Sequence, residues 1–176
     1  QRISWKRISP FVRQLLIPQS VFKQECFFIL AIVPNLQIFI QIIDIFFDLI
    51  KPQYAIFGKK DYQQLFLIRD FANNKYRSIK IVGQDTVRSE ALLALSSRNN
   101  LLGAKYLCKA NELFFALQEL VEMVKLTRSH KQAVAKIKSS LSQNGWVVEY
   151  VAIRRRRDLK EPSETDKSLV ALVAAR

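Results

Sequence analysis

Apolar residues recur with helical or strand-like spacing along much of the chain, and the order of these segments predicts an α/β fold. A hydrophobic segment at about 37–50 predicts a buried helix. It ends at Lys51-Pro52, because the residue before a proline is pushed out of the helical region. Apolar runs at 54–57 and 78–83 predict two strands, and an amphipathic run at 61–74 predicts a helix. Two strands that flank a helix indicate a βαβ unit and hence a parallel sheet.

The second half of the chain predicts a smaller α+β domain. The pattern loosens between Gly83 and Leu95, where we expect the domain boundary. Apolar residues at three- and four-residue spacing then predict a long helix, and Asn144-Gly145 marks the end of another. The predicted elements are helices at 103–124 and 130–143, a strand at 146–153, a turn region at 154–167 and a strand at 168–175.

The start of the chain does not continue this pattern. We expect an irregular basic arm with one short helical piece at 1–26, followed by a strand-like run at 27–33. The stretch 27–43 has no charged residue and is close to the minimum length for a membrane span. Because Pro34-Asn35 interrupts it, a strand followed by a buried helix is favoured, and membrane association is kept as an alternative.

Composition adds a strong positive charge to this picture. Apolar residues make up 49% and charged residues 24%, as in ordinary globular proteins, but the net charge is +13. Such a charge suggests an anionic partner, and the count alone leaves nucleotide, nucleic acid and acidic lipid open.

The cysteines and the single histidine exclude several kinds of site. Cys26 and Cys108 are far apart and lack metal-type spacing, which fits a reducing compartment and a cytoplasmic protein. His130 alone cannot build a His-rich metal site, and its polar neighbours predict a solvated residue in the turn between two helices. No metal ligands are therefore predicted. The chain starts with Gln1 and has no recognisable signal peptide, so we expect a fragment or a processed product.

Residues 58–64, which we call the first polar cluster, follow the strand predicted at 54–57. In α/β proteins such a turn places ligand-binding groups at the carboxyl end of a strand. Lys60 is a candidate for neutralising a phosphate, Asp61 for accepting from a ribose hydroxyl, and Gln64 for holding a carboxylate or hydroxyl. The alternative is that Asp61 only caps the following helix and that Lys59 and Lys60 are a solvated pair.

Residues 96–99, Ser-Ser-Arg-Asn, form a second polar cluster after another apolar run. Two hydroxyls, their backbone N–H groups and the guanidinium of Arg98 would surround an anion. The alternative is a helix cap with a surface arginine. We expect both clusters to face one anionic ligand.

The run Arg154 to Arg157 suggests nucleic acid or an acidic membrane face. Stacking aromatic residues do not alternate with these arginines, so the pattern of an RNA-binding platform is missing. A solvated basic turn is the favoured interpretation.

Several longer segments carry a family resemblance: Phe57-Gly-Lys-Lys-Asp-Tyr-Gln-Gln-Leu65 with Ile68-Arg69, Ile81-Val-Gly83, Thr86-Val-Arg88, Leu93-Ala-Leu-Ser-Ser-Arg-Asn99, Val148-Glu-Tyr-Val151 and Leu172-Val-Ala-Ala175. In sequence, order and spacing they resemble the C-terminal part of the pantothenate synthetase (pantoate–beta-alanine ligase) family. The resemblance covers about residues 42–176.

This resemblance implies a partial Rossmann-like nucleotidyltransferase domain with a parallel sheet, followed by a small α+β lid domain, commonly in a homodimer. We therefore expect a divergent basic and apolar segment at 1–34, the remnant of an adenylate-binding domain at 35–84 and the C-terminal lid domain at 85–176.

The resemblance also implies an ATP-dependent, magnesium-assisted ligase of coenzyme A biosynthesis that joins pantoate and beta-alanine through pantoyl adenylate. Lys60 would be the catalytic residue, in contact with phosphate. By the same resemblance, Gly58 and Asp61 would hold the ribose, Gln64 would bind pantoate, Val87 would lie near the adenine, and Ser96, Ser97 and Arg98 would bind the phosphates.

Departures from the family pattern predict that the isolated chain is truncated and incomplete or inactive. The family's His-x-Gly-His motif, whose histidines stabilise the adenylation transition state, has no counterpart here. Lys59 stands where the family has glutamate, and Ala91-Leu92 stands where it has Asp-Gly. The alternative function is a basic nucleic-acid-binding module, based on the net charge and the arginine run.

Overall fold

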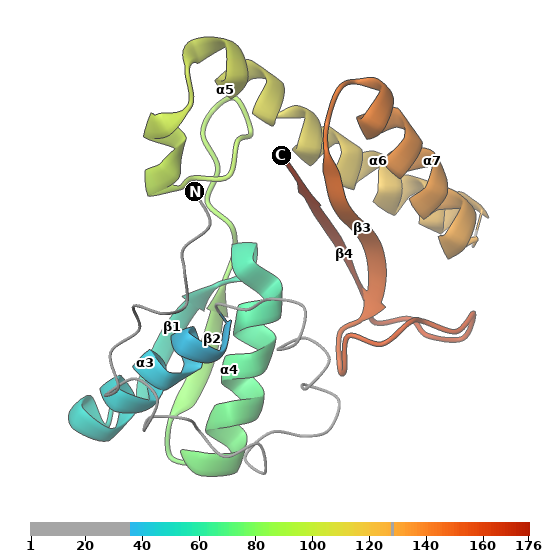
Figure 1. Ribbon diagram of the computed structural model, residues 1–176. Helices are drawn as coiled ribbons and strands as arrows, with labels where there is room; N and C mark the ends of the chain where they lie inside the picture. Colours follow the sequence, from blue (N-terminus) through green and yellow to red (C-terminus); the bar gives the residue numbers. More distant parts are fainter. Residues whose placement is uncertain (1–35, 128) are drawn as a thin grey trace, which may run out of the picture. The chain divides into compact units, whose positions relative to one another are not determined.

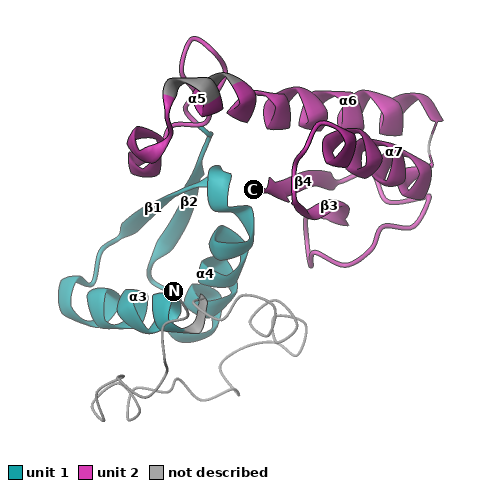
Figure 2. Cartoon of the chain, turned by 45° about the horizontal axis from the view of Figure 1, so that its top comes forward, with its two compact units in different colours: residues 1–86 teal, residues 87–176 magenta. Residues whose placement is uncertain are grey.

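The computed structural model describes residues 36–127 and 129–176, and the chain divides into two compact units (Figure 2). Unit 1 comprises residues 1–86 and unit 2 comprises residues 87–176. The division at Thr86 falls in the stretch where the apolar pattern loosens. Which segments act as adenylate-binding and lid domains stays a prediction.

Residues 36–86 of unit 1 form a βαβ unit preceded by a helix (Figure 1). Strands β1 and β2 pair in parallel, from Tyr54 opposite Lys80 to Gly58 opposite Gln84. The predicted helix near 37–50, the strand–helix–strand order and the parallel sheet are therefore confirmed. The helix is not fully buried as predicted, because Leu49 and Ile50 are 76% and 65% exposed. The elements are α3 (Leu36–Ile50), β1 (Tyr54–Gly58), the 3-10 helix η3 (Lys59–Asp61), α4 (Tyr62–Lys75) and β2 (Lys80–Gln84).

Helix α4 supplies most of the core of unit 1, because it packs against α3 and against both strands. Its most buried apolar side chains recur at the helical spacing that the sequence predicts. They are Leu65, Leu67, Ile68 and Phe71, each at most 1% exposed.

Tyr76, directly after α4, joins α4 to α3. Its hydroxyl donates to the carboxylate of Asp44, which also accepts from Lys75 Nζ at 2.6 Å. The Tyr76 ring lies edge-on to Phe47 and Phe71, with centroid separations of 5.4 and 5.6 Å. Burial and the neighbouring Asp44 carboxylate raise the pKa of the Tyr76 phenol above its usual range, so the hydroxyl remains a donor.

Two boundaries in unit 1 show how local chemistry ends an element. Helix α3 ends where the sequence predicts, because Lys51 adopts a left-handed conformation (φ 47°) and its N–H donates to the Phe47 carbonyl at 3.0 Å. Strand β2, predicted from residue 78, begins only at Lys80. The turn after α4 continues to Ile79, whose N–H donates to the Tyr76 carbonyl at 2.9 Å.

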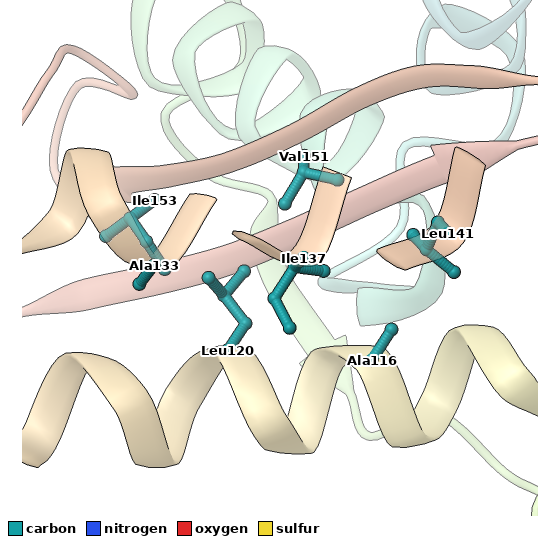
Figure 3. Packing of buried hydrophobic residues seen from close by; sticks show 7 residues of the cluster. All are labelled: Ala116, Leu120, Ala133, Ile137, Leu141, Val151 and Ile153. Atoms are coloured by element: carbon teal, nitrogen blue, oxygen red, sulfur yellow. The ribbon is translucent and has the colours of Figure 1, made fainter. Parts of the chain in front are cut away.

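Unit 2 packs two helices against an antiparallel strand pair, so the predicted α+β character is confirmed. Figure 3 shows side chains of α6 pointing toward α7, with β3 completing the cluster. The elements are η4 (Ser97–Leu101), α5 (Ala104–Ala110), α6 (Glu112–Thr127), α7 (His130–Gln143), β3 (Val148–Arg155) and β4 (Leu169–Ala175). The buried cluster consists of Ala116, Leu120, Ala133, Ile137, Leu141, Val151 and Ile153.

The single long helix predicted at 103–124 is wrong, because α5 and α6 meet at Asn111. The Asn111 carbonyl accepts from the N–H groups of Phe114 at 2.9 Å and Phe115 at 3.3 Å, which starts a new helix. Asparagine is a poor residue inside a helix because its side chain competes for backbone groups. The apolar residues keep their helical spacing across Asn111, so the sequence pattern predicted one helix where the structure has two.

The last elements agree with the prediction in type and order, and the main differences are at the two ends of β3. Helix α7 ends at Gln143, and Gly145 follows with the positive φ of 80° that favours glycine. Strand β3 was predicted at 146–153 but runs from Val148 to Arg155, because Arg154 and Arg155 pair with β4.

The basic arm expected at 1–26 and the strand expected at 27–33 lie outside the described residues. Helix α3 covers most of the remaining uncharged stretch. Within residues 36–127 and 129–176, no helix combines the length and the apolar character that a membrane span needs.

Candidate functional site

The first polar cluster lies at the carboxyl end of β1, as predicted. Gly58 is the last residue of the strand, Lys60 and Asp61 belong to η3, and Gln64 lies in the first turn of α4. The first three are exposed and Gln64 is half-buried. Because β1 and β2 are parallel, their carboxyl ends meet at one edge of the sheet, which is where α/β proteins bind ligands.

Lys59 is held by Asp85, a contact that the sequence analysis missed. Gly58 pairs with Gln84, so these two charged residues directly follow the paired strand ends. Lys59 Nζ lies 2.5 Å from Asp85 Oδ1, and the lysine holds the pKa of the Asp85 carboxyl below its usual value. Lys59 is exposed, as the interpretation of a solvated pair expects, and it also forms an ion pair at the surface. The signal available in the sequence was an acid placed just after the second strand.

Asp61 directly precedes α4, but its side chain forms no capping hydrogen bond to that helix. A capping aspartate would accept from the N–H of the second or third helical residue. The capping interpretation is therefore wrong for the Asp61 carboxylate, which is exposed at the cluster. Asp61 stays a candidate ligand-binding residue.

The second polar cluster begins as a helix cap. Ser96 precedes η4, and its Oγ accepts from the Arg98 N–H at 3.2 Å. The capping alternative is thus correct for Ser96, although its hydroxyl hydrogen remains available to a phosphate oxygen. Ser97 and Arg98 are exposed. The Asn99 amide donates to the Ala94 carbonyl at 3.1 Å and ties the cluster to the preceding loop.

Arg88 organises the loop that leads into the second polar cluster, and the sequence analysis gave it no role. Its guanidinium lies 4.2 Å from the centroid of the Phe114 ring, and Nη1 donates to the Leu92 carbonyl at 3.0 Å. Leu92 has a positive φ of 66°, so this bond stabilises a strained turn. Val87 is 62% exposed, and its carbonyl accepts from the Leu95 N–H at 2.9 Å.

The two clusters belong to different units. Gly58, Lys60, Asp61 and Gln64 lie in unit 1, whereas the residues of the second cluster and Val87 lie in unit 2. Within each unit the structure brings the predicted residues together. That both clusters face one ligand stays a prediction.

The expected solvated turn is confirmed for Arg156 and Arg157, which are exposed in a turn, and is wrong for Arg154 and Arg155, which belong to β3. Arg155 Nε and Nη2 donate to the two carboxylate oxygens of Asp158 at 3.0 and 2.6 Å, and its side chain is only 19% exposed. Arg156 Nε donates to the Leu169 carbonyl at 2.9 Å. The run therefore closes the connection between β3 and β4, and this geometry does not favour the nucleic-acid alternative.

His130 was expected in a solvated turn, but it is the half-buried first residue of α7. The helix begins there because the Ala133 N–H already donates to the Ser129 carbonyl at 3.1 Å. Among the described residues, no group of three or more His, Cys, Asp or Glu side chains is placed to hold a metal ion.

Comparison with known proteins assigns a family to this arrangement. A sequence model described as pantoate-beta-alanine ligase matches residues 35–176. The pantothenate synthetase of Shewanella loihica is 36% identical over 129 residues, which are 73% of this chain and 46% of that protein. The pantothenate synthetase of Methylobacillus flagellatus is 38% identical over 131 residues, or 74% of this chain and 47% of that protein.

A solved structure shows the same similarity in three dimensions. The pantothenate synthetase of Thermus thermophilus superposes with a TM-score of 0.74 at 33% identity, covering 80% of this chain and 51% of that one. This confirms the predicted fold class, a Rossmann-like nucleotidyltransferase α/β part followed by a small α+β domain. The chain spans about half the length of the curated relatives that it matches. Because the matched residues form most of the chain, it belongs to the pantoate–beta-alanine ligase family.

Proposed function

We propose that this chain supplies the C-terminal part of an ATP-dependent pantoate–beta-alanine ligase. The observation that carries the proposal is the family match over residues 35–176, which includes both polar clusters. The chain spans about half the length of its curated relatives, and it contains a single histidine. We therefore infer that the isolated chain binds ligand but is a poor catalyst or inactive.

The proposed reaction has two steps. A carboxylate oxygen of pantoate attacks the α-phosphorus of ATP, an oxygen–phosphorus bond forms, and pyrophosphate leaves. The amine of beta-alanine then attacks the acyl carbon of pantoyl adenylate, and AMP leaves with the bonding electrons of the carbon–oxygen bond. Both steps move negative charge onto phosphate oxygens, so fixed cations and hydrogen-bond donors would stabilise their transition states.

The first polar cluster would supply Lys60 as the cation that contacts phosphate. Its position at the carboxyl end of a parallel strand supports this role. The exposed Asp61 carboxylate would accept from a ribose hydroxyl beside the Gly58 backbone. Gln64, half-buried in the first turn of α4, would bind pantoate through its amide.

The second polar cluster would hold phosphate oxygens. Arg98 offers a charged fork of donors, and the hydroxyls of Ser96 and Ser97 add two neutral ones. Val87, whose side chain is mostly exposed, would contact the adenine. Arg88 would fix the loop that carries these residues, since it joins the turn at Leu92 to the Phe114 ring.

The family resemblance implies magnesium. Among the described residues, no group of three or more acidic, His or Cys side chains is placed to bind it. Magnesium in ATP-dependent enzymes commonly keeps several waters and binds substrate phosphates with only one or two carboxylates. We therefore assign no step to a metal ion held by this chain.

Isothermal titration of the full chain with ATP tests the proposed site. Lys60→Ala and Arg98→Ala each remove a charged donor, so each is expected to cost about 1.5–3 kcal/mol of binding, or roughly a tenfold to 150-fold rise in Kd. Lys80→Ala is the control in unit 1, because Lys80 lies at the opposite, amino end of β2. Arg176→Ala is the control in unit 2, where that side chain is 78% exposed.

Absence of ATP binding, or equal effects of test and control variants, would contradict the proposed site. Rapid pantothenate formation by the isolated chain from pantoate, beta-alanine and ATP would contradict the inferred inactivity. A homodimer and a cytoplasmic location, both expected from the sequence analysis, belong to the same proposal. Light scattering of the purified chain tests the first, and fractionation of cells tests the second.

A further inference from the structure

Helix α3 is apolar on two opposite sides. Ile40, Ile43 and Phe47 are buried, and the edge contact between Phe47 and Tyr76 shows that this side faces α4. At 3.6 residues per turn, four further apolar side chains lie away from this buried side. We call them the outer surface of α3: Ile42, Ile45, Phe46 and Leu49, which are 47%, 41%, 51% and 76% exposed.

No charged residue interrupts the outer surface of α3. The two acids of the helix, Asp44 and Asp48, lie toward Lys75, with oxygen–nitrogen distances of 2.6 and 4.0 Å. A contiguous exposed apolar surface of this kind marks a contact with another protein or with a membrane. Within residues 36–127 and 129–176, no helix has the length and hydropathy of a membrane span.

Strand β1 has an exposed apolar face as well. Tyr54 and Ile56 are 60% and 68% exposed, whereas the alternating residues Ala55 and Phe57 are half-buried. Since α4 packs on this sheet, the half-buried residues face α4 and the exposed ones point to the opposite side. Parallel sheets are normally covered on both faces. Within the described residues the sheet has two strands, and the side of β1 that carries Tyr54 and Ile56 is exposed.

The family comparison indicates what covers these surfaces. The family match begins at residue 35 and α3 begins at Leu36, so α3 is the first element of the matched fold. About half the length of each relative has no counterpart in this match. We propose that the outer surface of α3 and the exposed face of β1 dock the unmatched half of the family fold, and that this half binds when supplied as a separate polypeptide. The inference rests on family membership and not on the proposed catalysis.

Co-expression tests this docking surface. The full chain is produced with a tagged polypeptide comprising the part of the Methylobacillus flagellatus relative that this chain does not match. We expect a one-to-one complex by affinity capture and light scattering. Leu49→Glu and Phe46→Glu place a charge on the outer surface of α3 and are expected to weaken the complex at least tenfold. Leu126→Glu in α6 is the matched control, because Leu126 is a helical leucine with a similar exposure of 81%.

Circular dichroism and hydrogen exchange in α4 verify that each variant is folded, which is expected because the substituted side chains are exposed. The proposal is overturned if no complex forms, or if a folded Leu49→Glu variant binds like the wild type. It is also overturned if the outer surface of α3 instead mediates self-association or binding to anionic phospholipid vesicles. A complex that forms without making pantothenate would leave this inference standing and count against the proposed function alone.

Discussion

Replacing Gly83 in β2 by alanine is expected to destabilise unit 1, whereas the same change at Gly58 in β1 is not. A Cβ at Gly83 would lie 2.7 Å from Arg69 Nη2 and 2.9 Å from Leu65 Cδ2. The tip of the arginine can move away, but Leu65 is 1% exposed inside the α4 packing and has no room to shift. At Gly58 the nearest atom would be Lys60 N at 3.9 Å, an ordinary contact.

The magnitude follows from two opposing effects. Overpacking of a close-packed site costs about 1–3 kcal/mol. Alanine also restricts the unfolded chain, which returns about 0.4–1 kcal/mol at a compatible backbone conformation. With both effects taken near the middle of their ranges, the net loss at Gly83 is about 1–2 kcal/mol, or a roughly 5- to 30-fold larger open population. At Gly58, where φ is −74°, only the second effect operates, so we expect unchanged or slightly higher stability.

Native-state hydrogen exchange of β2 and α4 amides is the appropriate assay, because the two units need not unfold together. Exchange should become roughly 5- to 30-fold faster in Gly83→Ala and no faster in Gly58→Ala. The double variant Arg69→Ala, Gly83→Ala should retain most of the loss of stability, since the close contact of the added Cβ with Leu65 remains. Wild-type exchange rates in Gly83→Ala would refute the reasoning, and complete rescue by Arg69→Ala would show that Leu65 is not the obstacle.

Two further predictions concern the core of unit 2 and the joint between α3 and α4. Leu120→Ala, at a position with 0% exposure, should cost about 2–5 kcal/mol in urea unfolding followed by Trp146 fluorescence in a Trp5→Phe background. The exposed control Leu126→Ala should stay within about 0.5 kcal/mol, and equal effects would contradict the assigned core. Tyr76→Phe should cost about 1.5–3 kcal/mol, measured by exchange of α3 amides, because it removes a donor to the Asp44 carboxylate. Folding raises the pKa of Tyr76. The stability that the Tyr76 hydroxyl contributes is therefore complete below the ordinary phenol pKa of about 10 and is lost progressively as pH rises above it. Ionisation of Tyr76 at the same pH as exposed tyrosines would contradict this.

The sequence by itself determined the order of elements and the location of the candidate residues. Apolar periodicity, Lys51-Pro52 and Asn144-Gly145 are local signals, and local signals decide where most helices and strands lie. The sequence also indicated candidate ligand-binding residues, because both polar clusters directly follow apolar runs. These features depend on residues that are close together in the sequence, so they can be recognised from the sequence pattern.

Only the tertiary structure decided which residues are partners. The contact between Lys59 and Asp85 depends on the parallel register that sets Gly58 opposite Gln84. Arg155, expected in a solvated run, is half-buried because it pairs with Asp158. The outer surface of α3 could not be told from its inner side, since both are apolar and only packing against α4 distinguishes them. Such contacts depend on how the chain folds back on itself, and packing decides which of two apolar sides is buried. A local sequence pattern contains neither piece of information.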